Sequence, residues 1–71
     1  MLTGLTWTSG EDKITATSTT GIEVGMLVSH EDFAVGTTVI DVNGLVITTS
    51  TNATDAETSG NVNFVSYEPI S

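Results

Sequence analysis

The residues best suited to chemistry in this 71-residue chain stand together at His30-Glu31-Asp32. An imidazole next to carboxylates has the composition of a general base with an acid to orient it. No Ser or Cys stands beside it in a nucleophile motif, and a polar loop explains the same three residues. A short chain also has little room for a pocket of the usual size, roughly 300 Å³ or more. The sequence therefore predicts no catalytic residues and no enzyme.

Acidic residues recur close together at Glu11-Asp12, Glu31-Asp32 and Asp55/Glu57. Loop carboxylates can bind Ca²⁺, which takes about six to eight oxygen ligands. Neither the EF-hand spacing nor a glycine-rich nonapeptide repeat is present, and solvated turn carboxylates are the alternative. One His and no Cys leave no standard zinc site. We therefore predict no metal and no cofactor.

The charge balance is strongly acidic. Nine Asp and Glu residues accompany a single basic side chain, Lys13, which gives a formal net charge of −8. Nucleic-acid binding requires clustered Lys and Arg, and an acidic membrane surface would repel this chain. We expect neither partner. A well-solvated surface explains the acidity, and complementarity to a basic partner surface is the alternative.

The chain begins Met1-Leu2-Thr3-Gly4, without the basic and apolar regions of a secretory signal peptide. No apolar run approaches the ~18 residues needed to cross a bilayer. We expect a product made in the cytoplasm without a signal peptide, which stays there or leaves as part of a larger particle.

The composition is typical of β-structure, because Thr occupies fourteen positions and β-branched residues suit a pleated surface. Short strands bounded by turn residues are expected at 2–8, 13–17 and 26–29, in a hairpin at 37–50, and at 62–67.

The intervening segments are expected to be loops. His30 to Gly36 should form one that carries Phe33 inward, and the polar stretch 51–60 another, in which a single helical turn at 53–57 is an option.

The hairpin is predicted from Asn43-Gly44, the pair that best tolerates the positive φ angles of a type I′ turn. A two-residue turn at this pair would place Val42 opposite Leu45 and Ile40 opposite Ile47. These four side chains would then share a core face. The other face would carry Val39, Asp41, Val46 and Thr48, which is more apolar than a solvent face requires.

Strand-like segments at roughly ten-residue spacing predict an all-β fold, a small antiparallel β-barrel or sandwich of five to six short strands with a central Asn-Gly hairpin. Residues 1–71 should form a single domain. Its core is expected at about residues 13–65, with the terminal segments available as arms in assembly contacts.

A domain of this size rarely gains more than ~3 to 5 kcal/mol from its core alone. No disulfide can assist, so self-association through open sheet edges is the expected stabiliser, in a homotrimer or homodimer. The candidate interface residues are Trp7, Val39, Val46 and Tyr67. For the two aromatic residues, ordinary packing of the terminal strands is the alternative.

Several segments follow one another in a recognisable order. They are Gly21-Ile22, Val24-Gly25-Met26-Leu27-Val28-Ser29, Ala34-Val35-Gly36-Thr37-Thr38-Val39, Val42-Asn43-Gly44, Val46-Ile47-Thr48, and then Ala53-Thr54, Gly60 and Phe64. Together they resemble a β-module that recurs in virion proteins of tailed bacteriophages. The resemblance covers residues 21–64.

The resemblance implies a virion structural protein. The module occurs in fibres, tail components and capsid-decorating proteins, and a chain without a trunk or coiled-coil heptads is short for a fibre. We therefore expect a capsid decoration, or cement, protein that binds the major capsid protein at the capsid surface of the virion and stabilises the head. The alternative is a tail-fibre or tail-associated module that binds a host receptor or carbohydrate.

Overall fold

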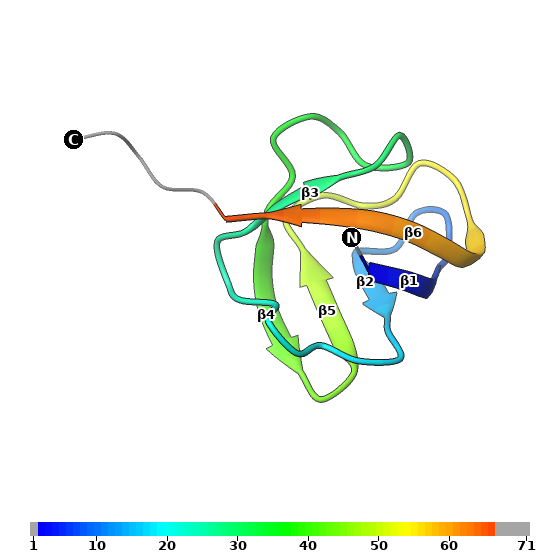
Figure 1. The fold of residues 1–71 in the computed structure, drawn as a ribbon. Coiled ribbons are helices and arrows are strands. Elements are labelled where there is room, and N and C mark those ends of the chain that lie inside the picture. Colours follow the sequence, from blue (N-terminus) through cyan, green and yellow to red (C-terminus); the bar gives the residue numbers. More distant parts are fainter. Residues whose placement is uncertain (1, 67–71) are drawn as a thin grey trace.

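Six antiparallel strands form one sheet that curls into a nearly closed barrel (Figure 1). The computed structural model describes residues 2–66, and none of these is helical. The strands are β1 (Leu2–Trp7), β2 (Lys13–Thr15), β3 (Leu27–Ser29), β4 (Val39–Asn43), β5 (Val46–Thr49) and β6 (Glu57–Val65). Their order in the sheet is β3-β6-β1-β2-β5-β4. The predicted all-β fold class is confirmed.

The barrel closes where β3 meets the start of β4. Leu27 forms an isolated bridge with Thr38. The Val28 N–H donates to the Thr37 carbonyl at 2.8 Å, and the Val39 N–H donates to the Met26 carbonyl at 2.9 Å. These bonds join the first and last strands of the sheet order, so β3 is paired on both sides and is not an open edge.

Two bulges interrupt the pairing of β1 with β6. From the pair Leu2↔Val62 to Leu5↔Gly60, β1 advances three residues while β6 advances two. From there to Trp7↔Glu57, β6 advances three residues while β1 advances two. Each bulge contains a residue with positive φ, Gly4 (74°) and Ser59 (58°). Bulges of this kind increase the local twist, which a small barrel needs to close.

Ser59 is the one non-glycine residue of the described chain with positive φ. We expect Ser59→Gly to raise the free energy of unfolding by about 1 kcal/mol, because Gly adopts this conformation without the clash of a Cβ atom. Urea unfolding followed by the fluorescence of Trp7, the single tryptophan, measures the change.

Ser29→Gly is the matched control, since Ser29 is exposed in β3 and has negative φ. It should lower stability by about 0.5–1 kcal/mol through backbone entropy. If both variants were destabilised alike, the bulge at Ser59 would carry no strain.

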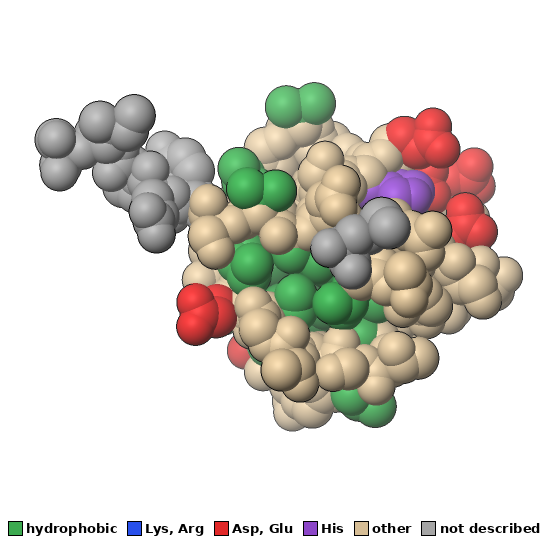
Figure 2. Space-filling view, viewed as in Figure 1, with side chains coloured by type: hydrophobic (Ala, Val, Ile, Leu, Met, Phe, Trp, Pro, Cys, Tyr) green, Lys and Arg blue, Asp and Glu red, His purple; other side chains and the backbone are tan. Residues whose placement is uncertain are grey.

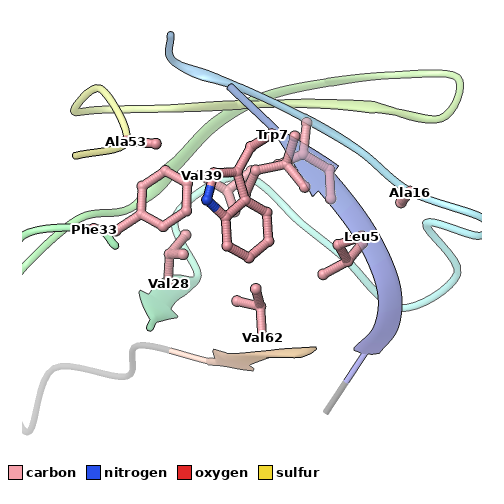
Figure 3. Packing of buried hydrophobic residues seen from close by; sticks show 10 residues of the cluster. Leu5, Trp7, Ala16, Val28, Phe33, Val39, Ala53 and Val62 are labelled. Carbon is pink, nitrogen blue, oxygen red and sulfur yellow. The ribbon is translucent and has the colours of Figure 1, made fainter. Parts of the chain in front are cut away.

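Ten buried hydrophobic side chains fill the barrel: Leu5, Trp7, Ile14, Ala16, Val28, Phe33, Val39, Ile47, Ala53 and Val62. The Trp7 indole lies centrally among them, with Phe33, Val28 and Val62 around it (Figure 3). Phe33 points inward from its loop, as predicted. The strand predicted at 2–8 is confirmed as β1, which pairs with both β2 and β6. It contributes Leu5 and Trp7 to the core, which therefore extends beyond the expected residues 13–65.

The predicted Asn-Gly type I′ turn is not what joins β4 and β5. Asn43 pairs with Val46, so the two turn residues are Gly44 and Leu45. Gly44 has a φ of +61° and Leu45 does not have positive φ, which is the pattern of a type II′ turn. The turn is therefore one residue later than predicted, and the pairing shifts by two residues, so that Val42 lies opposite Ile47 instead of Leu45.

A pairing shift of two residues leaves Val42 and Ile47 on the same face, so the differences from the predicted core face arise at the turn and at a bulge. Ile47 is buried and Val42 is half-buried, whereas Ile40 and Leu45 are exposed. Ile40 is turned outward at a bulge, where the ladder passes from Val39↔Thr49 directly to Asp41↔Thr48. Val39, predicted for the outer face, is buried.

The predicted loop at 51–60 ends earlier than expected, since β6 begins at Glu57. The helical turn considered at 53–57 does not form. Ala53 is buried, and its N–H donates to the Glu11 carbonyl at 2.8 Å while its carbonyl accepts from the Gly10 N–H at 2.8 Å. Pairing with the β1–β2 connection therefore replaces the local bonds that a helix would need.

Candidate interaction site

A groove of about 380 Å³ lies beside the connection between β3 and β4. It is lined mainly by apolar residues of β3, of the loop 30–36 and of the end of β6: Leu27, Val28, Phe33, Ala34, Val35 and Val65, with His30 and Glu31 among the polar ones. Val35 is fully exposed and Val65 is half exposed. Hydrophobic side chains protrude over this loop in the space-filling view (Figure 2). Exposed apolar patches beside a hollow are typical of surfaces at which proteins bind other molecules.

The loop that forms one wall is fixed by an aromatic cluster. The Trp7 and His30 rings meet edge to face with centroids 4.7 Å apart, and the Trp7 and Phe33 centroids are 5.4 Å apart. The Trp7 Nε1–H donates to Asp32 Oδ2 at 3.2 Å. The loop is thus held to β1 by packing and by a hydrogen bond, so the groove wall is preorganised.

The His30-Glu31-Asp32 segment, considered above for acid–base chemistry, supports this loop. His30 Nδ1 accepts a hydrogen bond from the Asp32 N–H at 3.0 Å and lies 3.8 Å from Asp32 Oδ2. Asp32 Oδ2 in turn accepts from Trp7. In this geometry the Nδ1 lone pair is already used, and the side chains of His30 and Asp32 are mostly buried. The hydrogen bonds of His30 and Asp32 therefore fix the conformation of loop 30–36.

The other end of loop 30–36 is held by buried hydroxyl groups. Thr37 Oγ1 donates to the Ala34 carbonyl at 2.6 Å and lies 2.7 Å from Thr51 Oγ1. Thr49 Oγ1 lies 2.7 Å from the Thr51 carbonyl, to which it donates. Thr37 and Thr49 are fully buried, yet no buried side-chain nitrogen or oxygen in residues 2–66 lacks a partner. Sequence reasoning missed these threonines, because a buried Thr has the same strand-forming signal as an exposed one.

A second apolar surface lies on the β4–β5 hairpin. Ile40, Leu45 and Val46 are among the exposed large hydrophobic residues, with Leu45 51% exposed at the turn itself. Figure 1 shows the hairpin turn at the bottom of the barrel and loop 30–36 at the top. Leu45 at the turn and loop 30–36, which lines the groove, therefore lie at opposite ends of the molecule.

The predicted interface residues fall in different places. Trp7 and Val39 lie in the core of the chain itself and are almost completely buried. Val46 is on the outer face of β5 and is 36% exposed. Tyr67 lies outside the described residues. The structure therefore brings Trp7 and Val39 together in the core cluster and leaves Val46 apart on the outer face. The groove residues Val35 and Val65 were missed because nothing in a loop or strand end indicates how far a side chain protrudes.

The acidic side chains occupy mainly the connections between strands, and several gather on one side of the visible face (Figure 2). Lys13 Nζ donates to Asp12 Oδ1 at 2.7 Å, and this bond holds the pKa of the Asp12 carboxyl below its usual value. A lowered folded-state pKa stabilises the fold above the unfolded pKa, and this contribution is lost as the pH falls through the folded value. The pair is exposed, so its effect on stability is small.

Residues 2–66 contain no group of three or more His, Asp or Glu side chains placed to share a metal ion. The same part of the chain has no helix with the length and hydropathy that crossing a bilayer requires. In comparisons with known proteins, no family model, no curated protein and no solved structure matches this chain.

Proposed function

We propose that this chain is a structural protein of a tailed-bacteriophage virion, and that it decorates the capsid by binding the coat lattice and so stabilises the head. The resemblance of residues 21–64 to the phage β-module supports this proposal. The structural observation that carries it is a barrel filled by its own side chains, with exposed apolar surfaces at both ends. Such a molecule is suited to contacts between proteins.

The charge of the chain supports a coat partner with a basic surface. Lys13 is the single basic residue in the sequence, and it is already paired with Asp12. Complementary potentials speed association and select the correct partner. Carboxylates in the other connections would face a basic rim on the coat.

Addition of the purified chain to capsids from a phage strain that lacks its gene tests the proposal. We expect the chain to co-sediment with the capsids and to raise the temperature at which they release DNA. Because exposed charges are screened within about 10 Å at 0.1 M salt, binding should weaken as salt is added. Capsids that neither bind the chain nor gain thermal stability would contradict a decoration role.

A tail-fibre or tail-associated module that binds a host receptor or carbohydrate is the second candidate. The groove beside loop 30–36 favours it, because preformed hollows with aromatic and polar lining are where small ligands bind. A glycan array with reproducible hits that are lost in Val35→Asp, together with immunogold label at the tail tip, would support this function over capsid decoration.

A further inference from the structure

We propose that copies of this chain associate head to tail, with the tip of the β4–β5 hairpin of one copy seated in the groove beside loop 30–36 of the next. The tip is residues 43–46, and the groove is the one lined by Leu27, Ala34, Val35 and Val65. This inference deepens the proposed function, which calls for self-association. It is tested on the isolated protein, so it can fail without the capsid role failing.

The groove has the properties of a receptor for an apolar side chain. Its walls place fully exposed Val35 and half-exposed Val65 around a hollow of about 380 Å³. The wall is rigid, because Phe33 and His30 are packed on Trp7 and Thr37 fixes the end of the loop. A preformed wall loses little entropy when a partner binds.

The hairpin tip has the complementary shape. A two-residue turn is the narrowest connection in the barrel, and it projects Leu45 beyond the last pair of the ladder, Asn43↔Val46. Leu45 is half exposed although nothing in the local geometry requires an apolar residue there. An apolar anchor entering a pocket is the usual centre of a protein interface.

The distribution of carboxylates favours the hairpin tip over the other connections as the segment that enters the groove. Each of the other connections carries at least one carboxylate. Glu11 and Asp12 follow β1, Glu23 follows β2, Glu31 and Asp32 follow β3, and Asp55 follows β5. Among the connections in the described chain, Gly44-Leu45 alone has no carboxylate. Because Glu31 lines the groove, a carboxylate-bearing loop would be repelled there, whereas the hairpin tip is not.

The placement of the two surfaces determines the mode of association. Loop 30–36, which lines the groove, and the hairpin tip lie at opposite ends of one molecule, so a tip can only enter the groove of another copy (Figure 1). An interface between two different surfaces is heterologous and leads to a closed ring or an open filament. A trimer would be the smallest ring beyond a dimer.

Sedimentation velocity of the purified protein over a concentration series tests the interface. We expect the wild-type chain to associate, and Leu45→Asp and Val35→Asp each to weaken association by at least about tenfold, since each removes a buried apolar contact and adds charge. Val24→Asp is the matched control. Val24 is 63% exposed and lies in neither surface, so this variant should associate like the wild type.

Mixing the two variants distinguishes this arrangement from a symmetric one. Leu45→Asp keeps an intact groove and Val35→Asp keeps an intact tip, so an equimolar mixture should form a one-to-one dimer that neither variant forms alone. Urea unfolding of each variant verifies that it is folded, and Leu45→Ser and Val35→Ser repeat the test without added charge. A wild-type monomer at all concentrations, variants that associate normally, or a mixture that stays monomeric would overturn the proposal.

Discussion

An alanine at position 60 should lower the free energy of unfolding by about 1–3 kcal/mol, although it adds a single methyl group. A Cβ atom on Gly60 would lie 2.6 Å from Trp7 Cη2, 2.9 Å from Trp7 Cζ3 and 2.7 Å from Glu57 Cγ. Glu57 is exposed and can move. The Trp7 ring cannot, because it is buried and its Nε1–H is bonded to Asp32. The glycine therefore provides space for the indole against β6.

A double-mutant cycle with Trp7→Phe assigns this effect to the indole. Phenylalanine is the smaller ring and lacks the two indole carbons nearest to the added methyl. Gly60→Ala should therefore cost less in the Trp7→Phe background, with a coupling energy of about 1 kcal/mol or more. Urea unfolding followed by circular dichroism suits all four proteins. An equal cost in both backgrounds would mean that Glu57 or the β6 backbone causes the loss.

Phe33→Ala should leave most molecules unfolded at room temperature. Removing a buried Phe costs about 3–5 kcal/mol, which matches the ~3 to 5 kcal/mol that a core of this size supplies. Phe33 is buried against Trp7 although it lies in a loop, and its N–H donates to the His30 carbonyl at 3.1 Å. Phe33→Leu, which keeps most of the volume, should fold and lose about 1 kcal/mol.

Urea unfolding monitored by Trp7 fluorescence measures these variants, because the Phe33 ring lies against the only tryptophan. Val35→Ala is the control in the same loop. Val35 is fully exposed, so its replacement should change stability by no more than about 0.5 kcal/mol. If Phe33→Ala unfolded at the same urea concentration as Val35→Ala, loop 30–36 would not belong to the core.

The sequence was sufficient to predict strands and fold class, because β-branched runs between turn residues fit a pleated, half-buried surface. It was not sufficient for the register of the hairpin. Asn43-Gly44 favours a type I′ turn in isolation, but the observed turn is Gly44-Leu45, in a hairpin that contains a bulge at Ile40 and whose β5 also pairs with β2. Tertiary packing thus outweighs the local preference of the turn.

The candidate site was harder to predict than the strands for a related reason. The groove is formed by Leu27, Val35 and Val65, which come from β3, the loop after it and the end of β6. No spacing along the chain connects these three residues. Phe33 was identified as an inward side chain, yet its partner Trp7 is distant in sequence and was assigned to a terminal strand that was considered for an arm. The contact depends on the β1–β6 pairing, which no single segment specifies.

The two bulges in that pairing contain the positive-φ residues Gly4 and Ser59 and increase the local twist of β1 and β6. Beyond the bulges, β6 continues to pair with β3 up to Val65, which lines the groove.

Cryo-electron microscopy of virions, compared with virions of a strain that lacks the gene, tests the proposed role most directly. A capsid decoration protein should give density at regular positions on the coat lattice, fitted by the six-stranded barrel, that is absent from the deletion strain. Wild-type capsids without such density, or density confined to the tail, would contradict the proposal.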